Sequence, residues 1–198
     1  LSNWLEVEIY NEGKIYQQRY ERGKTMYPLK VIGECEKEKH GTKVTFSPDD
    51  TIFEETVYEY DVLKTRLREM AFLTKGIKIL LKDTREGQEK EDLFHYEGGI
   101  KEFVTYLNRS NEALYENVIY CEGQRDGVYV EVAMQHNDSY NEATYSFVNN
   151  ITTPEGGTHL AGFRNALTKT FNAYARNNKL LKDNEPALSG DDIREGLT

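Results

Sequence analysis

The stretch YSFVNNITTPEGGTHLAGFRNALTKTFNAY, residues 145–174, has the strongest pattern in the chain. A short apolar segment leads into a loop with two adjacent glycines, and a long amphipathic segment follows. Thr158 stands where a side chain can cap the first turn of a helix. Large apolar residues then recur at spacings of three and four, which predicts one buried helical stripe made of Leu160, Phe163, Leu167, Phe171 and Tyr174.

Two interpretations of the glycine pair Gly156–Gly157 stay open. Glycines before a helix can cradle an anion at the helix N-terminus. They can also serve only to shape the turn, because glycine adopts backbone conformations that other residues avoid. The local sequence favours the turn, since short glycine patterns often match by chance.

Composition indicates an ordinary globular protein. The 198 residues are 30% charged and 38% hydrophobic, and the net charge is −9. This negative charge argues against a surface built for unspecific duplex binding, although a local basic patch is compatible with it. No apolar run approaches the roughly 20 residues of a membrane span, so we expect no membrane association. The sequence starts without Met and stops at residues 196–198, inside an apparent helix, so we expect a fragment of a longer chain.

The chain predicts an α+β fold with short antiparallel strands. Alternating polarity predicts strands at 5–10, 15–20, 29–32, 42–46, 77–82, 91–96, 118–122, 128–134 and 144–149. Helices are expected at 59–74, at 100–108 and from 158 onward, and Ser189 with Asp192 predicts a capping box at a last helix. The first helix should bury Tyr60, Leu63, Leu67 and Met70, and the strand-like context of Cys35 and Cys121 predicts that both thiols are buried.

No complete catalytic or metal-binding constellation is visible in the sequence. The four histidines have neither the spacing nor the neighbouring cysteines of a zinc site. No nucleophile elbow and no Walker phosphate loop occur. Two classes of function therefore stay open: an interaction module of a larger machine, or part of an enzyme site that other residues complete.

Four motifs resemble the DNA gyrase B family, the ATPase subunits of bacterial type IIA topoisomerases. They are REMAFLTKG at 68–76, HYEGGI at 95–100, NNI at 149–151 with EGGTH at 155–159, and GDDIREGL at 190–197. They occur in that family's order and spacing, and the resemblance covers essentially the whole chain. The corresponding B protein of topoisomerase IV shares most of these motifs.

The resemblance implies a division into two domains. Residues 1–97 are similar to the later half of a GHKL ATP-binding domain, with a partial antiparallel sheet and backing helices. Residues 98–198 are similar to a transducer domain, truncated at its C-terminal side, with a mixed sheet and a long helix. The family's catalytic Glu, its magnesium-binding Asn and the transducer lysine that reaches the γ-phosphate lie outside these 198 residues. We therefore expect no catalytic residue and no metal ligand here, and no tight binding of ATP or Mg²⁺ to these residues alone.

Several site residues follow from the resemblance alone. Gly41 and Thr42 match the family's Gly-Thr pair, whose threonine lines the adenine site, and Val44 matches an apolar residue of the same wall. Asn11 stands near a position where the family often has an Arg that contacts aminocoumarin-type inhibitors, and an amide cannot replace a guanidinium fork. Arg164 and Lys169 match basic positions on the helix that lines the family's DNA cavity.

The resemblance also implies function and partners for the whole protein. It implies ATP-driven passage of one duplex through another, with negative supercoiling, in the cytoplasm. The implied partners are the gyrase A protein, a second copy of the ATPase protein, and double-stranded DNA. The alternatives are the equivalent part of the topoisomerase IV B protein, which decatenates, and a non-catalytic transducer or interaction module.

Overall fold

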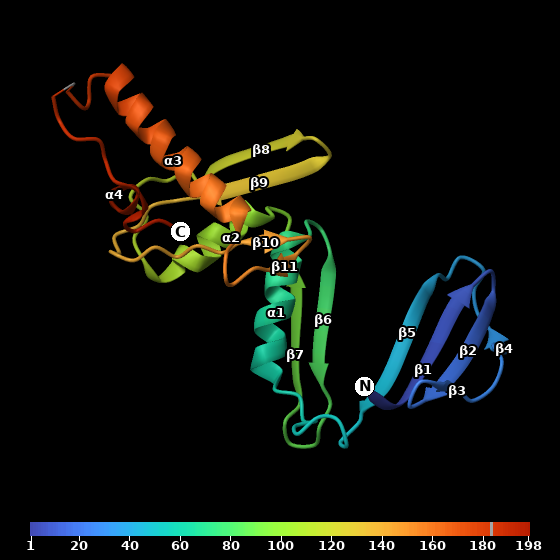
Figure 1. The fold of residues 1–198 in the computed structure, drawn as a ribbon. Coiled ribbons are helices and arrows are strands. Elements are labelled where there is room, and N and C mark those ends of the chain that lie inside the picture. The colour runs from blue at the N-terminus through green and yellow to red at the C-terminus, as the bar shows by residue number, and fades with distance from the viewer. Residues whose placement is uncertain (183) are drawn as a thin grey trace. The chain divides into compact units, whose positions relative to one another are not determined.

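The computed structural model describes residues 1–182 and 184–198 and divides into two compact units. Unit 1 is Leu1–Glu59 and unit 2 is Tyr60–Thr198 (Figure 1). Antiparallel sheets and a few helices make an α+β fold, as predicted. The predicted division into residues 1–97 and 98–198 follows the domains of the family, whereas the two units are defined by their internal contacts. The predicted domain boundary therefore stays a prediction.

Unit 1 is a single antiparallel sheet. Its strand order is β3-β2-β1-β5, with β4 also paired to β2, and the predicted strands are confirmed. Strands β1, β2 and β5 extend past their predicted ends, because backbone pairing recruits the residues next to each turn. Strand β4 begins one residue later than predicted, and the short β3 was not predicted. The strands are β1 (Ser2–Asn11), β2 (Lys14–Glu21), β3 (Lys24–Thr25), β4 (Lys30–Glu34) and β5 (Gly41–Pro48).

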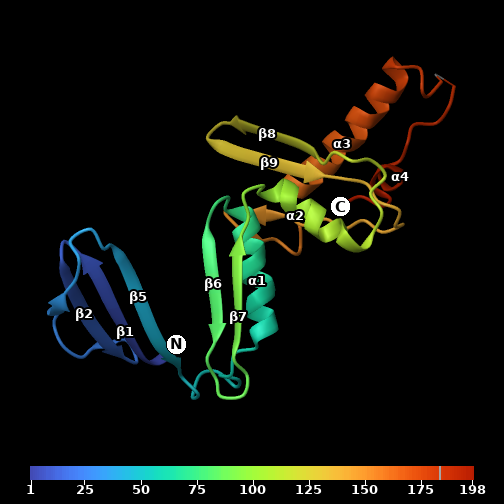
Figure 2. The same cartoon turned by 180° about the vertical axis from the view of Figure 1, so that it is seen from behind.

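Unit 2 begins with a helix that lies along a hairpin. Helix α1 (Tyr60–Leu73) packs on β6 (Lys78–Asp83) and β7 (Lys90–His95), as Figures 1 and 2 show. Tyr60 is buried as predicted, but the prediction for Met70 is wrong, since it is 39% exposed. Ala71 and Phe72 are buried in its place.

An aromatic stack explains which face of α1 is buried. The ring of Phe72 stacks on Tyr96, with centroids 3.6 Å apart, and on Phe103, with centroids 4.9 Å apart. Phe103 belongs to α2 (Ile100–Leu107), which continues into a short 3₁₀ helix at Asn108–Ser110. Stacked rings bury large apolar areas, so they fix α1 against α2.

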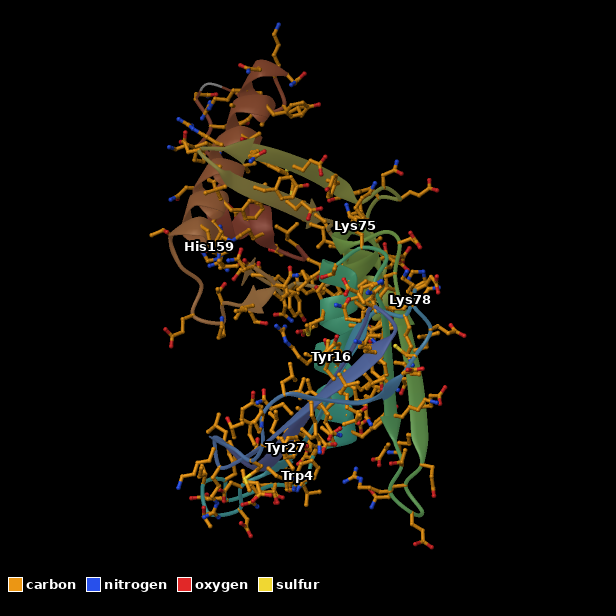
Figure 3. All side chains as sticks on the ribbon, turned by 90° about the vertical axis from the view of Figure 1, so that its right-hand side faces the viewer. Trp4, Tyr16, Tyr27, Lys75, Lys78 and His159 are labelled. Atoms are coloured by element: carbon orange, nitrogen blue, oxygen red, sulfur yellow. The ribbon has the colours of Figure 1, made fainter. Side chains whose placement is uncertain are left out.

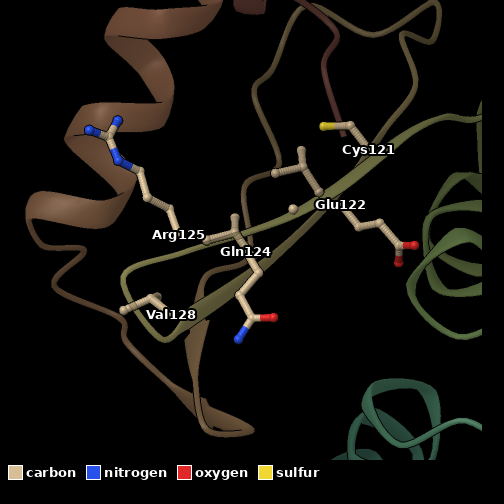
Figure 4. A pocket seen from close by; sticks show the side chains of 8 residues that line it. Cys121, Glu122, Gln124, Arg125 and Val128 are labelled. Atoms are coloured by element: carbon tan, nitrogen blue, oxygen red, sulfur yellow. The ribbon is translucent and has the colours of Figure 1, made fainter.

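The next hairpin confirms the predicted turn. Strands β8 (Ile119–Arg125) and β9 (Val128–Met134) are joined by Asp126 and Gly127, whose φ angles of 52° and 78° are both left-handed. The apolar row on β9 is exposed at its start, with Val128 at 61%, and half-buried at Val132 and Met134. Cys121, labelled in Figure 4, pairs with Val132 of β9 and is exposed, so the prediction that Cys121 is buried is wrong.

Helix α3 (Thr158–Asn177) follows the short hairpin β10 (Phe147–Val148) and β11 (Ile151–Thr152). The predicted cap at Thr158 is wrong: the N-cap is Gly157, with φ 143°, and no side chain caps the helix. Leu167 is buried as predicted, whereas Tyr174 is 63% exposed. The buried stripe therefore ends before Tyr174.

The last residues form a turn and an isolated β-bridge between Leu197 and His136 rather than a continued helix. Helix α4 (Gly190–Arg194) begins with the predicted capping box of Ser189 and Asp192 and ends before Glu195, which is extended. Thr198 then exchanges two backbone hydrogen bonds with Gln135, of 3.0 and 2.9 Å. Ile193 and Leu197 pack with Leu167 as a buried cluster that ties α4 and the end of the chain to α3. None of the helices in the described ranges is long and apolar enough to cross a membrane.

Candidate functional site

The residues predicted to line a nucleotide pocket lie on one face of the unit 1 sheet. Strand β5 pairs with β1 so that Thr42 stands opposite Ile9 and Val44 stands opposite Val7. Cross-strand partners point to the same face of a sheet. The Thr42 hydroxyl is therefore a single polar group in a row of aliphatic side chains, an arrangement that suits a flat, partly polar ring such as adenine.

Asn11 lies at the same end of this sheet. It follows Tyr10, whose pairing partner is Gly41. The register thus brings Asn11 and the Gly41–Thr42 pair to neighbouring strand ends, although they are far apart in the sequence. The roles of Asn11, Gly41, Thr42 and Val44 stay predictions.

The apolar face forms one open wall. Val44 is 53% exposed and Phe46 is 48% exposed. Strand β5 is the last strand of its sheet, so it presents a free backbone edge within the described residues. A wall of this kind can contact one side of a ligand but does not enclose it.

The opposite face of the same strands is polar. The Tyr10 hydroxyl donates to Glu8 Oε2 at 3.1 Å, and Lys43 Nζ lies 3.4 Å from the same oxygen. The hydrogen bond from Tyr10, followed by the charge of Lys43, lowers the pKa of Glu8 below its ordinary value. The two faces therefore differ sharply in polarity, and only the face with Thr42 suits an apolar ring.

The second candidate site is on helix α3, where Arg164 is engaged by a carboxylate. Arg164 Nη2 lies 2.6 Å from Glu142 Oε1, and Arg164 Nε donates to the same oxygen at 3.1 Å. Arg194 Nε donates to Glu142 Oε2 at 2.9 Å. Glu142 thus joins α3, α4 and the loop before β10 in one ion-pair network.

The network determines the ionisation of Glu142. Burial raises the pKa of this carboxyl group, but hydrogen bonds from Thr144, Arg164 and Arg194 outweigh burial, and the pKa lies below its ordinary value. Glu142 is therefore charged at neutral pH and holds both guanidinium groups.

Lys169 differs from Arg164 in its surroundings. Five helical residues correspond to a rotation of about 140°, so the two side chains project from different faces of α3. Lys169 is exposed and forms no ion pair within residues 1–182 and 184–198. Farther along α3, Arg176 donates to the carbonyl oxygens of Lys182 and Glu185. The structure therefore does not bring Arg164 and Lys169 together, and their contact with DNA stays a prediction.

The glycine pair before α3 shapes the chain. Gly156 and Gly157 have φ angles of 73° and 143°, which an L-residue rarely adopts. His159, labelled in Figure 3, lies in the first helical turn and makes a 3.1 Å hydrogen bond with Thr153 Oγ1. In the part of the chain that the structure describes, no cluster of His, Cys, Asp or Glu could hold a metal ion.

Sequence patterns did not indicate two residues that prove central to these contacts. Glu142 binds partners that lie 22 and 52 residues away. Arg66 of α1 binds Asn150 and Thr152, which lie 84 and 86 residues away. No local period marks such pairs, because only the fold brings them together.

The fold defines a class, the ATPase region of type II topoisomerases. The chain resembles the crystal structure of the 43K ATPase domain of Thermus thermophilus gyrase B in complex with an aminocoumarin, with a TM-score of 0.84 and 38% identity over the whole chain and 53% of that chain. It also resembles the topoisomerase IV ATP-binding domain of Francisella tularensis in complex with a small-molecule inhibitor, with a TM-score of 0.78 and 26% identity over the whole chain and 52% of that chain.

The family model described as DNA gyrase B matches residues 99–198, more than half of the chain, so the chain belongs to the DNA gyrase B family. The resemblance of the sequence motifs is thereby confirmed. The DNA gyrase B protein of Clostridium acetobutylicum is 55% identical over 199 residues, covering all of this chain and 31% of that protein. The chain thus spans about a third of the length of this relative.

Proposed function

We propose that this chain is part of the ATPase component of a DNA gyrase, in which ATP binding and hydrolysis drive duplex passage and negative supercoiling. The observation that carries the proposal is 55% identity to a DNA gyrase B protein along the entire chain. Several further DNA gyrase B proteins are 48–53% identical over the whole chain. This consistent similarity favours gyrase over topoisomerase IV.

The wall around Thr42 supports a role in binding the adenine of ATP. The Thr42 hydroxyl supplies one hydrogen-bonding group, while Val44 and Ile9 supply apolar surface on the same face. The family resemblance assigns Mg²⁺ and the phosphates to residues outside this chain.

Helix α3 supports a role in contacting the DNA segment that passes through. Lys169 offers an exposed ammonium group to a phosphate, a contact that adds affinity without reading sequence. Arg164 is the second candidate, and it would have to leave Glu142 to bind a phosphate. We further propose two protein partners in the cytoplasm, the gyrase A protein and a second copy of the ATPase component.

Reconstitution of the full-length protein with the gyrase A protein tests the proposed activity. With ATP and relaxed plasmid, we expect negative supercoils. Decatenation without negative supercoiling would assign the protein to topoisomerase IV. The absence of any ATP-dependent strand passage would instead favour the remaining alternative, a non-catalytic interaction module.

A second experiment tests the nucleotide wall. In the full-length protein, Thr42→Val should raise the KM for ATP about fivefold, the equivalent of one hydrogen bond of about 1 kcal/mol. Thr45→Val is the matched control, since Thr45 points to the other face of the same strand. Equal KM values for the two variants would show that Thr42 does not contribute to ATP binding. Residues 1–198 alone should show no ATP turnover, and turnover that survives Thr42→Val would contradict that expectation.

A further inference from the structure

Arg66 on helix α1 forms hydrogen bonds with the β10–β11 hairpin, which lies far away in the sequence. Its Nη2 donates to the carbonyl oxygen of Asn150 at 2.7 Å, and its Nη1 donates to Thr152 Oγ1 at 3.0 Å. Nη1 also lies 2.9 Å from Glu69 Oε2, one turn along the same helix. Glu69 thus orients the guanidinium group while the fork holds two acceptors of the β10–β11 hairpin.

The β10–β11 hairpin is too short to be stable by itself. Strands β10 and β11 contain two residues each, and so short a hairpin is unstable without outside support. The turn residues Asn149 and Asn150 both have left-handed φ angles, of 50° and 63°, as in a two-residue hairpin turn. Besides Arg66, the turn is held by Asn150 Nδ2, which donates to Thr74 Oγ1 at 3.1 Å, directly after α1.

The hairpin connects directly to helix α3. Only residues 153–157 separate β11 from Thr158. Thr153 binds Ser146 through its backbone amide at 2.8 Å and through its hydroxyl, and the same hydroxyl contacts His159 in the first turn of α3. A displacement of the turn is therefore passed to the start of α3 through a short segment with fixed hydrogen bonds.

A separate set of contacts maintains the fold when Arg66 is removed. The stack of Phe72, Tyr96 and Phe103 holds α1 against α2. Lys75, labelled in Figure 3, lies just after α1 with its Nζ 3.3 Å from Glu131 Oε1 on β9. Neither the aromatic stack nor the ion pair of Lys75 involves β10 or β11. Replacement of Arg66 should therefore preserve the packing of α1.

We propose that Arg66 is a positioning residue that fastens α1 to α3 through the Asn149–Asn150 turn. This inference rests on the proposed function, in which α1 belongs to the ATP-binding half and α3 faces the DNA. Loss of the Arg66 fork leaves the turn attached to the end of α1 only by the hydrogen bond from Asn150 to Thr74, so that a change on the nucleotide side moves α3 less. ATP hydrolysis then continues with fewer productive strand passages.

The chemistry of the contact requires a guanidinium group. Its planar fork presents several N–H groups at fixed angles and can serve a carbonyl, a hydroxyl and a carboxylate together. A lysine ammonium on a flexible stem can reach one of these acceptors but does not fix the geometry of all three. Arg66→Lys should therefore restore coupling only in part.

The test uses the full-length protein together with the gyrase A protein and measures strand-passage events per ATP hydrolysed. We expect Arg66→Ala to keep ATP hydrolysis within about twofold while events per ATP fall about tenfold, within the usual range of coupling energies. Thr152→Val should cause a smaller loss, and Arg66→Lys should lie between Arg66→Ala and the wild type. Arg85→Ala is the matched control, because Arg85 pairs with Asp83 within the β6–β7 hairpin and bridges no elements beyond it in the described residues.

The outcomes separate this inference from the proposed function. An unchanged number of events per ATP in Arg66→Ala, or an equal fall of ATP hydrolysis and strand passage, would overturn the role of Arg66. A wild-type protein that decatenates but does not supercoil would overturn the gyrase assignment, while decatenation per ATP would still test Arg66. Amide hydrogen exchange gives a readout independent of activity: Arg66→Ala should speed exchange at residues 149–153, and unchanged exchange there would also overturn the role of Arg66.

Discussion

Arg164 is paired with Glu142, with Nη2 and Oε1 only 2.6 Å apart. The family resemblance suggests Arg164 as a DNA contact, yet a carboxylate occupies its guanidinium fork. A phosphate could bind this fork only by displacing Glu142, which also holds Arg194. Lys169 has no such competitor among the described residues.

We expect Lys169→Ala to weaken DNA binding by the full-length protein more than Arg164→Ala does. The salt dependence of binding should lose about one unit of slope for a lost phosphate contact. Lys78→Ala removes the same charge from β6 and serves as the control. Binding titrations over a range of salt concentrations measure the slopes, and a larger loss with Arg164→Ala would show that Glu142 releases Arg164 to DNA.

Glu142→Gln should loosen the attachment of α4 to α3. Two charge-assisted contacts are weakened in a partly exposed site, so the free energy of local opening should fall by about 1–2 kcal/mol at pH 7. Because the folded state lowers the pKa of Glu142, this stabilisation is present above the ordinary pKa of a glutamate and is lost as pH falls through the folded-state value. Hydrogen exchange of α4 amides should therefore distinguish variant from wild type at pH 7 but not in acid, and a difference that persists in acid would contradict the ionic origin.

Gly196→Ala should detach the end of the chain from residues 135–137, which directly follow β9. A Cβ atom at this position would lie 2.5 Å from the Asn137 carbonyl oxygen and 2.6 Å from that of Ser139, and φ is 66°. Clash and left-handed strain together should cost at least about 2 kcal/mol. Loss of protection at the Gln135 amide, which donates to Thr198, reports the detachment.

Gly162→Ala is the matched control for Gly196→Ala. Gly162 lies within α3, and an added Cβ would meet no atom of the described residues within 4 Å outside its own helical surroundings. Alanine favours a helix over glycine by roughly 1 kcal/mol, so this variant should be stabilised. Equal effects of the two alanines on Gln135 protection would contradict the role of Gly196.

The Tyr60 hydroxyl should ionise at a higher pH than an ordinary tyrosine. Burial, followed by a 2.7 Å hydrogen bond to Asp92, raises the pKa of Tyr60 from 10.0 to about 12. The folded state thus keeps the phenol proton more tightly than the unfolded state, so this contribution to stability is complete below pH 10 and is lost as pH rises toward about 12.

Phenolate absorbance measures this ionisation. The difference between wild type and Tyr60→Phe should titrate near pH 12 rather than near pH 10. A midpoint at the ordinary value would show that Tyr60 is not shielded by burial and by Asp92.

Local patterns in the sequence determined most elements of the fold. The alternation of β9, the Asp126–Gly127 turn and the Ser189–Asp192 capping box depend on residues within a few positions of each other, and all three are confirmed. The family, too, followed from motifs read directly from the chain. These features are predictable because the interactions that cause them are short in sequence.

Only the tertiary structure decided which faces are buried and which charges are free. Met70 is exposed because the Phe72 ring, rather than Met70, faces the aromatic stack. Arg164 is occupied because the fold brings Glu142 from 22 residues away, and Arg66 reaches a turn 84 residues distant. The sequence determined the elements and the family, because periodicity and turn chemistry act locally. The tertiary structure determined the contacts between elements, because pairs so distant in sequence leave no periodic trace.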